Sequence, residues 1–280
     1  MRVVVEPGVE LGVDVRGQGP TLVCLHGFGG AKEDFGDYLD DLASEWQVVA
    51  PDLRGHGDSD APDDPSAYTL ERIALDVEAV ADAVGASQFV LLGHSMGGMV
   101  ARRVALREPR RVDGLVLMST AAGPPAGLDP ELVDMGAQLA GDDWTALAQL
   151  LDDVRPPGTP AYERLLAERD GFADYVAWKW SRVAPVMWAT LAPQLVREPD
   201  GLDTLRDLAC PALVMIGELD RGFYDGSLAM AEVIPDARLA VITDSGHHPQ
   251  FEQPDQWREA LWAFLTEVAP SRRELMEEQP

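Results

Sequence analysis

The sequence predicts an α/β fold in which a mostly parallel β-sheet is covered by helices on both faces. Short, continuously apolar runs recur along the chain, as strands buried on both faces require. They lie at residues 21–25, 47–50, 89–92, 115–118 and 212–216. Between these runs are stretches such as 70–84, with the three- and four-residue apolar spacing of an amphipathic helix. Alternation of the two patterns is typical of parallel strands joined by right-handed crossovers.

The remaining elements lie at the two ends of the chain. Residues 3–5 and 9–15 alternate loosely around the turn signal Pro7-Gly8, so we predict that the chain begins with an antiparallel hairpin. A last strand is expected near 239–242, and a helix over 254–268. Ligands of such sheets bind beyond the carboxyl ends of the strands, so the chemistry is expected there.

The strand pattern disappears between residues 121 and 208. This stretch contains two Pro-Pro pairs and four of the seven tryptophans, and we interpret it as a helical insertion. The predicted organisation is a core at 1–120 and 209–270, a helical cap at 121–208 and a charged tail at 271–280.

Composition limits the partners of the chain. The 280 residues include 48 acidic and 22 basic ones, for a formal charge of −26, which opposes binding to nucleic acid and to anionic membrane surfaces. No run approaches the ~18 apolar residues of a membrane-spanning helix. Because the first apolar run is too short for an export signal, we expect a cytoplasmic protein. The sequence predicts no particular oligomeric state.

The two cysteines, Cys24 and Cys210, lie on or directly beside a predicted core strand. Buried free thiols are therefore expected rather than a disulfide or a metal pair. The five histidines have no metal-ligand spacing, so we expect no metal and no cofactor.

The strongest local motif is Gly-His-Ser-Met-Gly at residues 93–97, which directly follows an apolar strand and precedes a helical pattern. It matches the G-x-S-x-G nucleophile elbow in the expected context. In such an elbow the serine, here Ser95, has a strained backbone, and its hydroxyl projects above the sheet. Ser95 is therefore the predicted nucleophile.

A serine hydroxyl needs a base that can change protonation near neutral pH, and histidine is the natural candidate. His26, His56 and His94 lie in glycine-rich loops or in the elbow itself, where a hydrogen-bonded structural role is expected. His247 and His248 follow the last predicted strand. The position after Gly246 favours His247 as the base.

The base in turn needs a carboxylate that fixes its tautomer and stabilises its charged form. Asp220 stands where the strand at 212–216 ends, on the same sheet edge as Ser95. Glu218, Asp225 and Asp244 are nearby rivals, but we predict Asp220 as the acid.

An oxyanion formed at the serine would need two backbone N–H donors. One is expected from Met96, the residue after the nucleophile. The other is expected from Phe28 in the segment His-Gly-Phe-Gly-Gly at 26–30, whose glycines allow close approach of the backbone. This segment lacks the spacing of a nucleotide-binding loop.

Together these motifs resemble the α/β-hydrolase superfamily, over residues 10 to 268. The order Ser95, Asp220, His247 is that of the family. Residues 51–59, Pro-Asp-Leu-Arg-Gly-His-Gly-Asp-Ser, are similar to a family loop whose role is largely structural. The resemblance implies an eight-stranded sheet and, in capped members, a helical lid where residues 121–208 fall. Arg221-Gly222, after the acid, departs from the apolar residues or proline of many relatives.

A serine nucleophile disfavours the family branches that attack with aspartate, such as epoxide hydrolases. The expected reaction is hydrolysis of a carboxylic ester or lactone through an acyl-enzyme, on an apolar small-molecule substrate. The same residues also suit carbon–carbon bond hydrolases, enol-lactonases, perhydrolases and the lyase-like synthase of menaquinone assembly. A receptor that turns over slowly is a further alternative.

The predicted cap carries two sets of candidate substrate contacts. Its apolar side chains either line a substrate pocket or pack the cap onto the core. They are Trp144, Phe172, Tyr175, Trp178, Trp180, Met187 and Trp188. An acidic substrate would need a cation, and the candidates are Arg155, Arg164, Arg169, Lys179, Arg182 and Arg197.

Overall fold

Eight strands form one sheet in the computed structural model, which describes residues 1–154 and 157–269. The strands are β1 (Arg2–Glu6), β2 (Val9–Arg16), β3 (Thr21–Leu25), β4 (Gln47–Pro51), β5 (Phe89–His94), β6 (Val112–Met118), β7 (Ala212–Gly217) and β8 (Ala237–Ile242). Their order across the sheet is β1-β2-β4-β3-β5-β6-β7-β8. The β1–β2 and β2–β4 pairs are antiparallel and all others are parallel. The predicted hairpin and the mostly parallel sheet are both confirmed.

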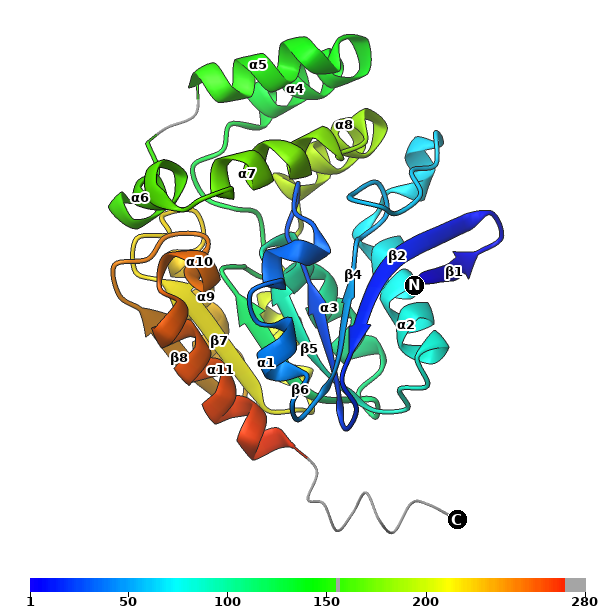
Figure 1. Cartoon of the computed structure of the whole chain (residues 1–280), viewed down its shortest axis with the longest axis vertical. Helices are drawn as coiled ribbons and strands as arrows, with labels where there is room; N and C mark the ends of the chain where they lie inside the picture. Colours follow the sequence, from blue (N-terminus) through cyan, green and yellow to red (C-terminus); the bar gives the residue numbers. More distant parts are fainter. Residues whose placement is uncertain (155–156, 270–280) are drawn as a thin grey trace.

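Helices cover both faces of this sheet (Figure 1). Strand side chains alternate between two apolar clusters, so that Val23 and Leu25 belong to one and Leu22 and Cys24 to the other. The first cluster includes residues of α2 (Leu70–Ala83), α3 (Met96–Arg107) and α9 (Tyr224–Val233). The second includes residues of α1 (Leu39–Leu42) and α11 (Pro254–Val268). Because helices pack on both faces of the sheet, the strands are apolar on both of their faces, which explains the continuous apolar runs in the sequence.

Five helices occupy the segment between β6 and β7. They are α4 (Pro130–Asp142), α5 (Trp144–Val154), α6 (Pro160–Glu168), α7 (Phe172–Ser181) and α8 (Pro185–Leu195). Two of them, α4 and α6, begin with proline after a capping side chain, and at α6 Thr159 Oγ1 accepts from the N–H of Tyr162. Figure 1 shows these helices gathered at one end of the sheet. The helical content of the insertion is as expected, and its status as a separate cap domain stays a prediction.

Shorter elements complete the chain. They are the 3₁₀ helices η1 (Lys32–Phe35), η2 (Pro65–Ala67) and η3 (Leu202–Asp207), and α10 (Pro249–Glu252). Cys24 and Cys210 are buried free thiols, as predicted. Within residues 1–154 and 157–269, every helix is too short or too polar to cross a membrane. The predicted tail at 271–280 and the cation candidate Arg155 lie outside the described residues.

Candidate active site

Ser95 stands at the turn between β5 and α3 with a strained backbone, φ 54° and ψ −119°. Two glycines make this turn possible. A Cβ on Gly93 would lie 2.4 Å from the carbonyl oxygen of Gly97, and a Cβ on Gly97 would lie 2.4 Å from that of Leu25. Strain of this kind costs about 1–3 kcal/mol and is typical of functional positions. The serine is therefore held at the N-terminus of α3, where the helix dipole favours a developing negative charge.

Asp220, which is buried, and His247, which is half-buried, form a carboxylate–imidazole pair at the same sheet edge. Asp220 follows β7 and His247 follows β8, and Nδ1 of His247 lies 2.8 Å from Oδ2 of Asp220. Because a carboxylate only accepts, Nδ1 carries the proton and Nε2 has a free lone pair. The ring of Phe223 stacks on His247 with centroids 5.0 Å apart. This is the arrangement of a base oriented by an acid.

The electrostatics of this pair favour a charged carboxylate. Burial would raise the pKa of Asp220, but the adjacent imidazole of His247 and its hydrogen bond to the carboxylate outweigh it and lower the pKa. Asp220 therefore stays ionised and can stabilise a positive charge on His247.

Backbone hydrogen bonds join the carboxyl ends of β5, β6 and β7, and this brings Ser95 close to Asp220 and His247. The N–H of Ser95 donates to the carbonyl of Met118 at 2.9 Å, and that of Ser119 donates to Met215 at 2.8 Å. His94, next to the serine, has its ring centroid 4.8 Å from that of His247. Among the described residues no hydrogen bond joins Ser95 Oγ to His247, so the structure links Asp220 to His247 but not His247 to Ser95.

The backbone N–H groups of Phe28 and Met96 face no acceptor within the described part of the chain. Gly27 brings the loop of Phe28 against Ser95, since a Cβ at Gly27 would lie 3.1 Å from that of Ser95. Two free N–H groups beside a serine are what an oxyanion requires.

Two neutral histidines hold this loop in place. The Nε2 atom of His26 accepts from the N–H of Leu53 at 2.9 Å, and that of His56 accepts from Gly29 at 3.1 Å. Burial is the main cause that lowers the pKa of His56 to about 3, and the nearby imidazole of His26 lowers it further. The structural role expected of these histidines is confirmed.

Comparison with known proteins then decides the family. Residues 20–254 match the family model described as alpha/beta hydrolase fold. The chain belongs to this family. It is 30% identical to a pimeloyl-[acyl-carrier protein] methyl ester esterase of Aeromonas hydrophila over 92% of this chain and all of that protein. It is 25% identical to a putative 2-succinyl-6-hydroxy-2,4-cyclohexadiene-1-carboxylate synthase of Bacillus subtilis, over 96% of this chain and 99% of that one. A thermophilic esterase from Thermogutta terrifontis has a similar structure, with a TM-score of 0.80, 28% identity and coverage of 96% and 99%.

Several cation candidates of this α/β-hydrolase already have acidic partners. Lys179 of α7 is buried, and its Nζ donates to Oδ1 of Asp34 at 2.8 Å. Tyr175 donates to the same oxygen at 2.7 Å. Arg169 pairs with Asp37, and Arg197 pairs with Asp134. These contacts fasten the inserted helices to the core or to each other.

Several of the apolar side chains of the insertion pack it onto the core. Phe172, Met187 and Trp188 are buried and pack within the hydrolase. Trp180 is partly exposed and lies against Gly29, whose Cβ would be 3.2 Å from the indole. It therefore covers the loop that carries the N–H of Phe28.

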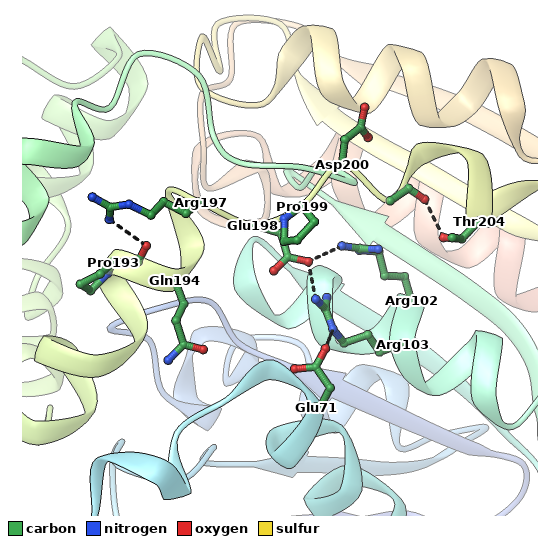
Figure 2. Close-up of a pocket in the computed structure, with 11 residues that line it drawn as sticks. Glu71, Arg102, Arg103, Pro193, Gln194, Arg197, Glu198, Pro199, Asp200 and Thr204 are labelled. Carbon is green, nitrogen blue, oxygen red and sulfur yellow. Dashed lines mark hydrogen bonds and ion pairs between the residues drawn. The ribbon is translucent and has the colours of Figure 1, made fainter.

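A cavity of about 870 Å³ lies elsewhere, where α8 and η3 meet α2 and α3 (Figure 2). Arg102 and Arg103 both donate to Oε1 of Glu198 there, and Arg103 also donates to Glu71. Arg102 donates in addition to the carbonyl of Ala122, on the other connection to the insertion. The charged groups of this cavity are paired with one another, and they bind both ends of the insertion to α3. The residues that line the cavity are different from those around Ser95.

Sequence reasoning missed two contacts around His247. His94 was given only a structural role, but its Nε2 lies 2.7 Å from the carbonyl oxygen of His247. Glu252 was not singled out, although its carboxylate is bonded on both sides of His247. An acid four residues after His248, on the short helix that follows, was the available signal.

Proposed function

We propose that this hydrolase cleaves a carboxylic ester or lactone through an acyl-enzyme formed on Ser95, with His247 as the general base and Asp220 as its acid. The observation that carries the proposal is the 2.8 Å contact of Asp220 with Nδ1 of His247, beside a serine in a strained elbow. Similarity over the full chain to two proteins named esterases supports the reaction class.

In the first half of the reaction Ser95 Oγ attacks the substrate carbonyl carbon while Nε2 of His247 takes the hydroxyl proton. The carbonyl oxygen becomes an oxyanion, which the N–H groups of Phe28 and Met96 stabilise. Collapse of this intermediate breaks the ester C–O bond, and His247 returns the proton to the departing alkoxide. The alcohol leaves, or stays attached if the substrate is a lactone.

In the second half a water molecule gives its proton to Nε2 of His247 and attacks the acyl carbon. The second oxyanion collapses, the bond to Ser95 Oγ breaks, and the serine recovers its proton. A carboxylic acid is released. Throughout, the charged Asp220 stabilises the transient imidazolium and holds its ring in place.

The charges of the protein favour a neutral or weakly polar substrate. Its net charge of −26 opposes the approach of anions. Lys179, Arg169 and Arg197 are each bound to an acidic side chain. An apolar small-molecule ester is therefore the substrate class that we favour. Two unpaired thiols fit a reducing compartment, so the proposed location is the cytoplasm.

Similarity to the protein named as a putative synthase supports one alternative, in which the same residues act in a lyase-like reaction. The name of that protein describes a carboxylate compound. A carboxylate ligand would compete with the acidic partners of Lys179, Arg169 and Arg197, which makes ester hydrolysis the stronger proposal.

Steady-state hydrolysis of short and medium p-nitrophenyl esters tests the proposal, with the wild type and Ser95→Ala measured side by side. We expect multiple turnovers by the wild type and none by Ser95→Ala, together with loss of fluorophosphonate labelling. Retained turnover in a folded Ser95→Ala variant would overturn the assignment of the nucleophile. Labelling without ester turnover would favour the lyase-like alternative.

A further inference from the structure

Glu252, at the end of α10, is a buried carboxylate to which the proposed reaction gives no role. Its Oε2 accepts from the backbone N–H of Gly246 at 2.8 Å, and its Oε1 accepts from that of His248 at 3.0 Å. These two N–H groups belong to the residues on either side of His247. The carboxylate thus bonds the main chain immediately before and immediately after the proposed base.

The inserted helices reach the same carboxylate. Thr159, the N-cap residue of α6, donates its hydroxyl to Oε2 of Glu252. Gly246 is enclosed between the two side chains, because a Cβ there would lie 2.6 Å from Cγ2 of Thr159 and 3.3 Å from both oxygens of Glu252. Thr159 is stiff at χ1, so any side chain at position 246 would separate these partners.

The rest of the loop around His247 is fixed as well. A Cβ on Gly217 of β7 would lie 2.1 Å from the carbonyl oxygen of Gly246, so the loop is pressed against the end of that strand. The carbonyl of His247 accepts from His94. With Glu252 added, the peptide groups on both sides of the imidazole each have a specific partner.

We propose that Glu252 is a positioning residue that holds the loop of His247, and that its bond from Thr159 makes this position depend on the seating of α6. The inference rests on the proposed function, in which His247 is the base. A displacement of about 1 Å between reacting groups can reduce a rate by 10²-fold. Loss of the carboxylate should therefore act on kcat more than on KM.

Glu252→Gln is the sharpest variant, because the amide keeps the size of the carboxylate. The N–H groups of Gly246 and His248 bond different oxygens of Glu252, and in glutamine one of these oxygens becomes an NH₂ donor that would face an N–H group. Glu259→Gln is the matched control, since it makes the same chemical change at an exposed position of α11. We expect kcat for a p-nitrophenyl ester to fall about 10- to 100-fold in Glu252→Gln and to be unchanged in Glu259→Gln.

A spectroscopic measurement distinguishes a positioning role of Glu252 from a purely structural role, because a purely structural role at α10 would not alter the imidazole of His247. The Nδ1 proton shared with Asp220 should give a low-field proton resonance, assigned by its absence in His247→Gln. We expect this resonance to broaden or shift in Glu252→Gln. A folded Glu252→Gln protein with normal kcat, or with reduced kcat and an unchanged resonance, would overturn the inference.

The link to α6 is tested at Thr159, which also decides the matter if Glu252→Gln fails to fold. Thr159→Val removes only the hydroxyl, whereas Thr159→Ser keeps it. We expect a severalfold lower kcat in Thr159→Val, with an altered resonance, and recovery in Thr159→Ser. Equal kcat and resonance in both variants would overturn the role of Thr159.

Ser95→Ala, measured in the same series, separates failure of this inference from failure of the proposed function. Activity that survives in Ser95→Ala contradicts the proposed function itself. An inactive Ser95→Ala alongside unaffected Glu252 and Thr159 variants contradicts the positioning role alone.

Discussion

His94 donates a hydrogen bond from Nε2 to the backbone carbonyl oxygen of His247, over 2.7 Å, and so joins the strand of the proposed nucleophile to the loop of the proposed base. The carbonyl can only accept, which fixes the proton of His94 on Nε2. Its buried Nδ1 has no partner among the described residues. Burial, with the neighbouring His247, lowers the pKa of His94 to about 3, so the ring is neutral.

Removal of this donor should loosen the loop of His247. In His94→Phe the carbonyl of His247 loses its partner, and we expect kcat/KM for a p-nitrophenyl ester to fall about 10-fold, for a loss of about 1.4 kcal/mol in transition-state stabilisation. His94→Gln retains an N–H donor and should keep more of the activity. Equal rates in the two variants, measured at pH 7.5, would contradict the role of this hydrogen bond.

Asp220→Asn tests the acid without removing its bulk. The amide has no countercharge, and its NH₂ group can donate to Nδ1, so the tautomer of His247 is no longer fixed, and we expect kcat to fall about 10³- to 10⁴-fold. The lowered pKa of Asp220 sharpens this test. Its charge contributes to stability above its ordinary pKa and is lost only as the pH falls through the lowered value, so wild-type Asp220 is ionised throughout a pH 5–9 assay. Kinetics and circular dichroism check the prediction, and a folded variant with wild-type kcat would refute it.

The acid stability of the protein should depend on His56, which is neutral and accepts from Gly29. The pKa of His56 is about 3 in the folded chain, below its ordinary value of 6.5. Between these values the unfolded chain binds a proton that the folded chain excludes. Stability is therefore complete above about pH 6.5 and declines as the pH falls, by about 1.4 kcal/mol per pH unit for one such group.

Urea unfolding of the wild type and His56→Gln at pH 7, 6 and 5 measures this slope. Glutamine keeps an acceptor for Gly29 but does not titrate. We expect the two curves of unfolding free energy against pH to converge as the pH falls. Parallel curves would show that His56 is not the group responsible.

The strand–turn–helix elbow around Ser95 was predictable because its signal is local. A buried strand, two glycines that flank a serine and a following helix all lie within residues 89–107, and a side chain at either glycine would collide with neighbouring backbone. Asp220 and His247 were predictable for a topological reason, since the carboxyl ends of parallel strands meet at one edge. The sequence therefore predicted the fold class and the residues now proposed for the site.

The contacts that support the site were not predictable in this way. His94 and His247 are 153 residues apart, and Asp34 and Lys179 are 145 apart. Neither spacing belongs to a helix or strand period. The arrangement of strands in the sheet brings His94 to His247, and the packing of the insertion on the core brings Lys179 to Asp34. For the same reason Lys179 looked like a substrate-binding cation in the sequence, although the fold pairs it with Asp34.

Gly97 should tolerate no side chain. Its Cβ would lie 2.4 Å from the carbonyl oxygen of Leu25, a backbone atom that cannot move aside without shifting β3. We expect Gly97→Ala to lower the free energy of unfolding by about 1–3 kcal/mol and to reduce labelling of Ser95 by a fluorophosphonate. Gly141→Ala in α4 is the control, because nothing lies within 4 Å of its Cβ and alanine favours a helix. An unchanged free energy of unfolding for Gly97→Ala, measured in urea, would contradict the conclusion that the elbow leaves no room for a side chain at this position.

Lys179 and Asp34 provide the last prediction, because both are buried and each neutralises the other. Burial would raise the pKa of Asp34, but the charge and hydrogen bond of Lys179 outweigh it and hold the pKa well below its ordinary value. Lys179→Met leaves Asp34 as an unpaired buried charge, which should cost about 3–5 kcal/mol of unfolding free energy, whereas the double variant with Asp34→Asn should cost less. Urea unfolding of the two single variants and the double variant measures this coupling. KM for a neutral ester should change little in a folded double variant, because Lys179 serves the seating of α7 and not the substrate. A large rise in KM there would instead make Lys179 a substrate contact.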